Sequence, residues 1–147
     1  MTADGQRLDH VGFVAASIRD IAPAVAQSTG TTWNGEIIHD PLQGVNVTFL
    51  RGSLPHEPSV ELVEPVGPES PVSRFLARGG GFHHLCYEVS NLEQQLTLGR
   101  SNGALVVRPP LPAVAFGGRR IAWVYTRQQL LLEFLERAPG EAGTPSR

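Results

Sequence analysis

The 147-residue sequence predicts a mixed α+β fold in which one order of secondary structure occurs twice. Apolar residues make up 41% of the chain, enough for a buried core, and charged residues only 18%. Sixteen glycines and twelve prolines favour many turns over a helical bundle. A strand, a helix and three strands are expected on each side of a proline- and glycine-rich segment, residues 65–80. This repeated order indicates an internal duplication.

In the first copy, residues 8–14 form a predicted strand, since they are rich in branched and aromatic side chains. A helix follows and ends at Thr29-Gly30. We expect it to begin near Asp20 rather than Ser17, because Pro23 belongs in a first turn. The three strands that complete this copy are predicted at 33–39, 44–51 and 58–64.

The second copy repeats this order after a short helix predicted over Val72–Arg78. Its first strand covers 82–89, and Ser90 with Glu93 forms a capping box for a helix that ends near Ser101. The remaining strands are predicted at 104–108, 119–126 and 129–136, with a loop at Pro109–Gly118. We expect one domain over residues 1–137, with modules at about 8–64 and 82–136, and a disordered tail at 138–147.

Charge and cysteine content exclude several classes of function. The net charge of −2 argues against a nucleic-acid partner, and a single cysteine rules out an internal disulfide framework. No apolar run approaches the roughly 20 residues that a membrane span needs, and Met1-Thr2-Ala3-Asp4 does not open a signal peptide. We therefore expect a cytoplasmic globular protein without a membrane partner.

Aligning the two copies places His10 over His84 and Glu61 over Glu133. The histidine and the glutamate are 51 residues apart in the first copy and 49 in the second. Two imidazoles and two carboxylates suit a divalent ion such as Co, Ni, Mn, Fe or Zn. Strand alternation puts bulky apolar residues on the opposite face of each strand, where a helix can cover them. The duplication therefore predicts a metal site with these four ligands.

Neighbouring polar residues have simpler interpretations. A single histidine in an apolar strand is more often a core residue than a ligand, but four residues at matching places favour ligation. His83 is expected to face away from His84, with a structural or supporting role, and Asp9 to be a surface or capping group. Arg119 and Arg120 are either solvated or bind a substrate carboxylate or phosphate.

Several stretches carry a family resemblance over residues 8–136. They are LDHVGFV (8–14), QGVNVTFL (43–50), VELVEPVGPESPVSRFL (60–76), GGFHHLCYEV (80–89), GRRIAWV (118–124) and LLLEFLE (130–136). They resemble the vicinal oxygen chelate superfamily of glyoxalases, bleomycin resistance proteins and dioxygenases, and within it most of all the methylmalonyl-CoA epimerases. The resemblance implies two tandem βαβββ modules that form an open curved mixed sheet around a metal cleft. It also implies a homodimer, and one divalent metal ion (Co, Ni, Mn or Zn) on His10, Glu61, His84 and Glu133.

Three functions are compatible with that resemblance. The first is a metal-dependent isomerase or epimerase that acts α to a carbonyl or acyl thioester, such as an acyl-CoA, through an enolate. The epimerases' proposed acid/base glutamate is replaced here by Val47, so Glu61 or Glu133 would transfer the proton. The second is a glyoxalase-like lyase or a dioxygenase, although a fourth ligand at Glu61 argues against the latter. The third is a binding module that sequesters a small molecule.

Overall fold

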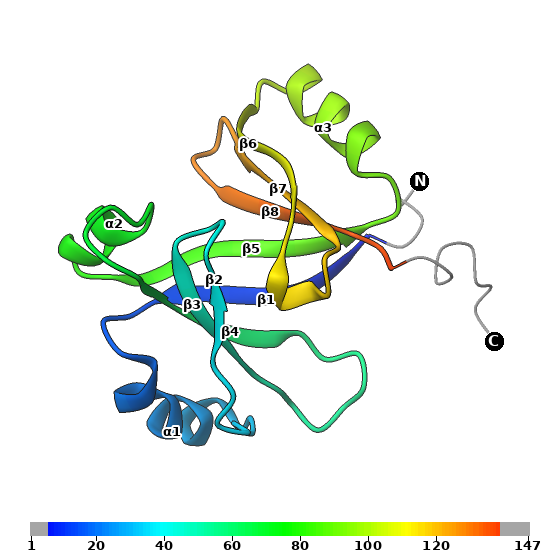
Figure 1. Cartoon of the computed structure of the whole chain (residues 1–147). Helices are drawn as coiled ribbons and strands as arrows, with labels where there is room; N and C mark the ends of the chain where they lie inside the picture. The colour runs from blue at the N-terminus through cyan, green and yellow to red at the C-terminus, as the bar shows by residue number, and fades with distance from the viewer. Residues whose placement is uncertain (1–5, 139–147) are drawn as a thin grey trace. The chain divides into compact units, whose positions relative to one another are not determined.

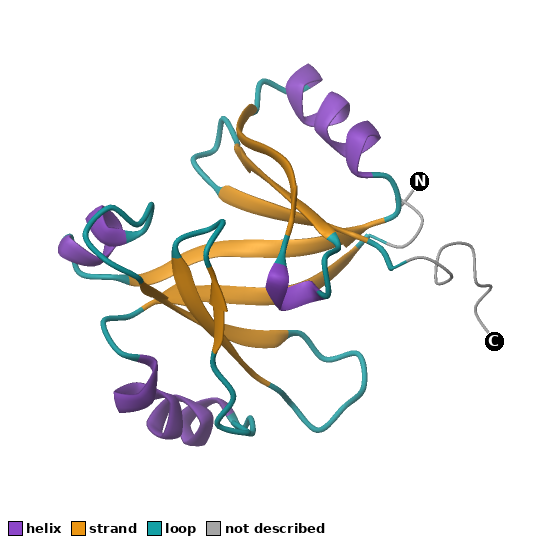
Figure 2. Ribbon diagram, in the orientation of Figure 1, coloured by secondary structure: helices purple, strands orange, loops and turns teal. Residues whose placement is uncertain are grey.

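The computed structural model describes residues 6–138 and has a mixed α+β architecture (Figures 1 and 2). In chain order the elements are β1 (Arg7–Val14), α1 (Ile18–Thr29), β2 (Ile38–Asp40), β3 (Val45–Leu50), β4 (Ser59–Pro65), α2 (Ser73–Ala77), β5 (Gly81–Val89), α3 (Leu92–Ser101), β6 (Leu105–Pro112), the 3-10 helix η1 (Val114–Phe116), β7 (Arg120–Tyr125) and β8 (Leu131–Glu136). The predicted α+β class is thus confirmed, and strand, helix and three strands do occur twice. The predicted tail beyond residue 138 lies outside the described residues.

The chain divides into two compact units, each described by itself. One unit is Asp9–Leu85, and the other joins the residues up to Leu8 to those from Cys86 onward. In the first unit the strands follow the order β2-β3-β4-β1, with β1 and β4 parallel and the other pairs antiparallel. In the second, β8, β7 and β6 are neighbouring antiparallel strands.

In the unit Asp9–Leu85, helix α1 covers one face of the sheet. Buried Ile18, Ala22 and Ala26 on the helix pack against Leu50 and Leu62 on the strands. Because side chains alternate along a strand, Phe49 and Glu61 lie on the opposite face, away from the helix. The apolar core of this unit therefore fixes which strand residues are available for a site.

Helix α1 begins at Ile18, so the predicted start near Asp20 is wrong. The hydroxyl of Ser17 caps the helix by accepting a hydrogen bond from the Asp20 N–H, and the Glu64 carboxylate on β4 accepts one from the Ile18 N–H at 2.7 Å. These two caps stabilise a first turn that leaves Pro23 inside the helix. The glutamate is distant in sequence, so the pattern around the proline gave no sign of it.

Strand β2 covers only three residues, so the predicted strand over 33–39 is mostly wrong. The indole N–H of Trp33 donates to the Thr48 hydroxyl, which in turn donates to the Glu36 carbonyl. Asn34 accepts a hydrogen bond from the Glu36 N–H. Side chains thus form hydrogen bonds with backbone groups of this segment, in place of the hydrogen bonds of a strand pair.

In the second unit, α3 covers one face of the strands, where Leu92 and Leu96 pack against Ala122, Val124 and Phe134. The helix is capped by Asn91, whose side chain accepts from the Gln94 N–H, and not by the predicted capping box at Ser90. Strand β6 includes three prolines, Pro109, Pro110 and Pro112, from the segment predicted to be a loop. It tolerates them because it is an edge strand whose register shifts on either side of Arg108.

None of the helices between residues 6 and 138 has both the length and the apolar character that crossing a membrane requires.

Candidate metal centre

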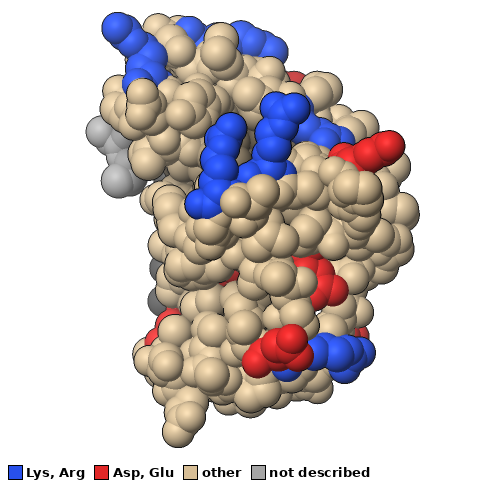
Figure 3. Space-filling view, turned by 90° about the vertical axis from the view of Figure 1, so that its left-hand side faces the viewer, with Lys and Arg blue, Asp and Glu red and all other residues tan. Residues whose placement is uncertain are grey.

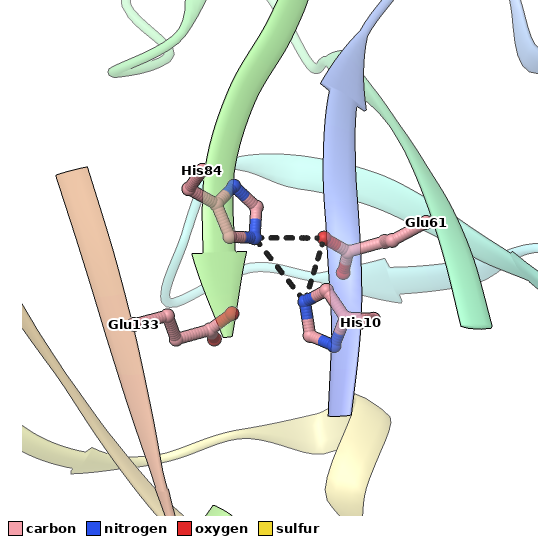
Figure 4. Close-up of side chains that lie close together, drawn as sticks. All are labelled: His10, Glu61, His84 and Glu133. Atoms are coloured by element: carbon pink, nitrogen blue, oxygen red, sulfur yellow. Dashed lines mark hydrogen bonds and ion pairs between the residues drawn. The ribbon is translucent and has the colours of Figure 1, made fainter. Parts of the chain in front are cut away.

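Three strands of the unit Asp9–Leu85 bring the side chains of His10, Glu61 and His84 together (Figure 4). His10 lies on β1, Glu61 on the parallel strand β4, and His84 on β5. The His10 Nε2 and His84 Nε2 atoms are 3.2 Å apart, and each is 3.2 Å from the Glu61 Oε1 atom. Two nitrogen donors and one oxygen donor therefore form an equilateral triangle.

The size of this triangle fits a transition-metal ion. With metal–ligand bonds of about 2.1 Å, neighbouring donors are about 3.0 Å apart in an octahedral site and about 3.4 Å apart in a tetrahedral one. The measured 3.2 Å lies between these two values. Imidazole nitrogen and carboxylate oxygen are also the donors that Zn, Co, Ni and Mn accept. The residues present thus fit a divalent cation in both spacing and chemistry.

All three side chains are buried, which makes their charge important. The exposed fractions are 0% for His10, 5% for Glu61 and 1% for His84. Burial alone would raise the pKa of the Glu61 carboxyl, but the adjacent His10 and His84 imidazoles outweigh it and hold that pKa far below its usual range. Glu61 is therefore a carboxylate, the form that a cation requires.

Gly12 makes room for the His84 imidazole. A Cβ atom at this position would lie 2.1 Å from Cε1 of His84 and 2.6 Å from each of its ring nitrogens. The His84 imidazole therefore lies directly against the backbone of β1. The absence of a side chain at Gly12 thus provides the space that the His84 ring occupies.

The imidazole of each of the two histidines, His10 and His84, contacts the side chain of the residue that precedes it. The Asp9 Oδ2 atom is 2.8 Å from His10 Nδ1, and His83 Nδ1 is 2.9 Å from His84 Nδ1. When Nε2 is the ligating nitrogen, Nδ1 carries the proton and donates to these partners, which fix the tautomer and the ring orientation.

The His83 contact agrees with the supporting role expected for this residue, whereas the expected orientation of its ring and the expected surface role of Asp9 are corrected. Asp9 is more than a surface group, and the His83 ring turns back to its neighbour instead of facing away, supported by an edge contact with Phe75 at 4.8 Å. The only signal in the sequence was that both copies place a hydrogen-bonding residue immediately before the ligand histidine.

The remaining predicted site residues lie in the other unit. Glu133, also labelled in Figure 4, is buried on β8 opposite Trp123 of β7, on the face away from α3. The Arg119 guanidinium donates to the Glu88 carboxylate at 3.1 Å, and that of Arg120 to Glu136 at 2.7 Å. Both arginines are thus engaged in ion pairs with carboxylates of their own unit.

Residues 9–123 match the family model described as the Glyoxalase/Bleomycin resistance protein/Dioxygenase superfamily. The chain belongs to this superfamily. The match begins one residue before His10 and includes Glu61 and His84. The expected family is therefore confirmed.

Within this superfamily, the chain is similar to methylmalonyl-CoA epimerases. It is 31% identical over 125 residues to an ethylmalonyl-CoA/methylmalonyl-CoA epimerase of Cereibacter sphaeroides, covering 82% of this chain and 89% of that one. A crystal structure of methylmalonyl-CoA epimerase from Mycobacterium tuberculosis matches with a TM-score of 0.79 and 25% identity, covering 98% and 96% of the two chains. A hypothetical protein from Bacillus halodurans matches with a TM-score of 0.78 and 29% identity over 97% of this chain and 99% of that one. These relatives support an epimerase-like enzyme.

Proposed function

We propose that this superfamily member is a divalent-metal-dependent epimerase or isomerase that acts on the carbon α to a carbonyl or acyl thioester. The triangle of donor atoms from His10, Glu61 and His84 is the observation that carries the proposal. Glu133 completes the set as a fourth ligand, which its burial and its place in the second copy of the repeat support. The names of the relatives support an acyl-CoA substrate of the methylmalonyl type.

A bound divalent cation supplies Lewis-acid stabilisation for the negative charge that develops on a substrate oxygen when the α-proton leaves. The protein's part is to hold the donors in place before substrate arrives. Asp9 and His83 hold the two imidazoles in the ligating tautomer, and Gly12 permits the close approach of His84. Burial of all three donors excludes bulk water and strengthens the electrostatic contribution.

A carboxylate must move the α-proton, and the sheet face near the donors offers few. Val47 lies on the same face of β3 as Phe49 and is 5% exposed, so this position provides an apolar wall and no base. Proton transfer would then fall to the Glu61 or Glu133 carboxylate.

Proton exchange with solvent tests this function. The cobalt-loaded protein is incubated in deuterated water with methylmalonyl-CoA, ethylmalonyl-CoA and a set of α-hydroxy carbonyls, and mass gain at the α-carbon is measured. We expect exchange to stop on chelation and to return with added cobalt or manganese. His84→Ala should lose exchange and metal together.

A second set of substrates distinguishes an epimerase activity from a lyase activity. If no α-proton exchanges but a hemithioacetal of glutathione and methylglyoxal is converted, the protein is a glyoxalase-like lyase. Binding without either reaction would indicate a sequestering module. The homodimer and the cytoplasmic location stay predictions, to be checked by light scattering and by cell fractionation.

A further inference from the structure

We propose that Arg51 is the residue that recognises an anionic group of the acyl thioester substrate, either its free carboxylate or a phosphate of its carrier. This proposal rests on the proposed function and names a specificity-determining residue for it. Arg119 and Arg120, which the sequence suggested for this role, are paired with glutamates, whereas Arg51 lies in the same unit as the three donor atoms.

Arg51 follows the last residue of β3 and is on the donor side of the sheet. Its side chain shares a face with Phe49, two residues earlier, because side chains alternate along the strand. The guanidinium carbon stands 5.2 Å from the centre of the Phe49 ring, and that ring makes an edge contact with the His10 imidazole at 5.4 Å. A continuous series of contacts therefore connects the guanidinium to a metal ligand.

Both ends of the Arg51 residue are fixed. Its N–H donates to the Thr32 carbonyl at 3.0 Å, and its carbonyl accepts from the Thr32 N–H at 2.8 Å. The Nη1 atom donates to the hydroxyl of Ser59 at 3.2 Å, and Ser59 is the register partner of His10. An arginine held at its backbone and at its head loses little freedom when it binds an anion.

Within the described part of the chain, no carboxylate forms an ion pair with Arg51. The chain contains no lysine, so every blue side chain in Figure 3 is an arginine. Four of them, Arg7, Arg119, Arg120 and Arg137, lie within ion-pair distance of glutamates. Among residues 6–138, Arg51 has a hydroxyl and an aromatic ring as its contacts and no carboxylate. Its exposed side chain retains N–H donors in the fork arrangement that matches a carboxylate or a phosphate.

Binding of three thioesters to the cobalt-loaded protein tests the proposal and identifies the anion. Methylmalonyl-CoA carries a carboxylate and phosphates, propionyl-CoA only phosphates, and methylmalonyl-N-acetylcysteamine only a carboxylate. Isothermal titration compares the wild type with Arg51→Ala, Arg51→Lys and the control Arg19→Ala, which removes an exposed arginine from α1 on the opposite face.

We expect Arg51→Ala to raise the Kd of the thioesters that carry the recognised anion by about 10- to 100-fold. Arg51→Lys should fall between, because it keeps the charge without the fork, and Arg19→Ala should change nothing. In the proton-exchange assay, Arg51→Ala should raise the KM for these thioesters while kcat is retained. A loss confined to the two CoA thioesters identifies phosphate, and a loss confined to the two methylmalonyl compounds identifies the carboxylate.

Equal Kd values for Arg51→Ala and Arg19→Ala with all three probes would overturn the role of Arg51. If the wild type binds none of the three, the proposed function is wrong, and Arg51 is then judged with malonate and pyrophosphate as probes. Weaker binding of either anion by Arg51→Ala than by Arg19→Ala supports the anion site. Equal binding, or none by the wild type, refutes it.

Discussion

Replacing Gly12 by alanine should remove His84 from the metal centre while leaving the fold intact. The new Cβ would lie 2.1 Å from the imidazole Cε1, whereas ordinary van der Waals contact begins at 3.4 Å. The ring must therefore retreat by more than 1 Å, about five times the roughly 0.2 Å that metal–ligand distances tolerate. Gly12 is absent from the glycines with positive φ, so the substitution adds no backbone strain and its effect comes from the displaced ring.

The loss of one ligand should weaken metal binding by more than about 100-fold, since even supporting residues are worth about 10- to 100-fold. Cobalt affinity is measured by competition with a chromophoric chelator, and the visible spectrum of bound cobalt reports the change in coordination. At 100 times its Kd, a metal stabilises the folded wild type by about 2.7 kcal/mol, or about 5–10 °C in Tm. Gly12→Ala should lack most of this shift.

Gly99→Ala is the matched control for this experiment. Its added Cβ would meet only Ala104 at 3.6 Å, an ordinary contact, and it lies within helix α3. We expect it to bind cobalt like the wild type and to be more stable by about 0.5–1 kcal/mol because alanine favours the helix. Wild-type cobalt affinity in Gly12→Ala would refute the inference that His84 ligates from its present position.

Substitutions at three further positions examine the surroundings of the donor residues. Asp9→Ala should weaken cobalt binding by about 10- to 100-fold and Asp9→Asn by less, since asparagine keeps an acceptor for His10 Nδ1; unchanged affinity in both would mean that Asp9 does not orient His10. His83→Ala should keep its metal but bind it about tenfold more weakly in the same titration, and a complete loss of metal would instead make His83 a ligand. Val47→Glu should raise α-proton exchange of methylmalonyl-CoA by up to about 10²–10⁴-fold in the mass-spectrometric assay, and fast exchange by the unaltered protein would show that no base is missing at Val47.

The ligand face could be predicted from the sequence because it depends on local periodicity and on the repeat. Alternation along β1 and β4 puts His10 and Glu61 opposite Phe13 and Leu62, and the structure packs the latter two against α1. That inference needed no knowledge of how the strands pair. Val47 was singled out by the family resemblance alone, and the structure places it on the same face of β3 as Phe49.

Features that depend on distant partners were missed. The start of α1 depends on Glu64, which is 46 residues away from Ile18. Arg119 looked available for substrate because Glu88, its partner, lies 31 residues earlier in the chain. Arg51 was not singled out for the same reason, since its partners Thr32 and Ser59 come from separate segments. Local patterns carry no information about which of two arginines will meet a carboxylate.

The border between the two compact units does not follow the border between the two repeats. The unit Asp9–Leu85 takes His10 and Glu61 from the first repeat and His84 from the opening strand of the second. A break in the connecting segment 65–80 would leave two fragments, neither of which carries all three donors. The visible absorption of bound cobalt would then show whether the two fragments reassemble. A gene that encoded a single repeat could not have made this donor triangle alone, so metal binding gives a reason for two fused copies to stay in one chain.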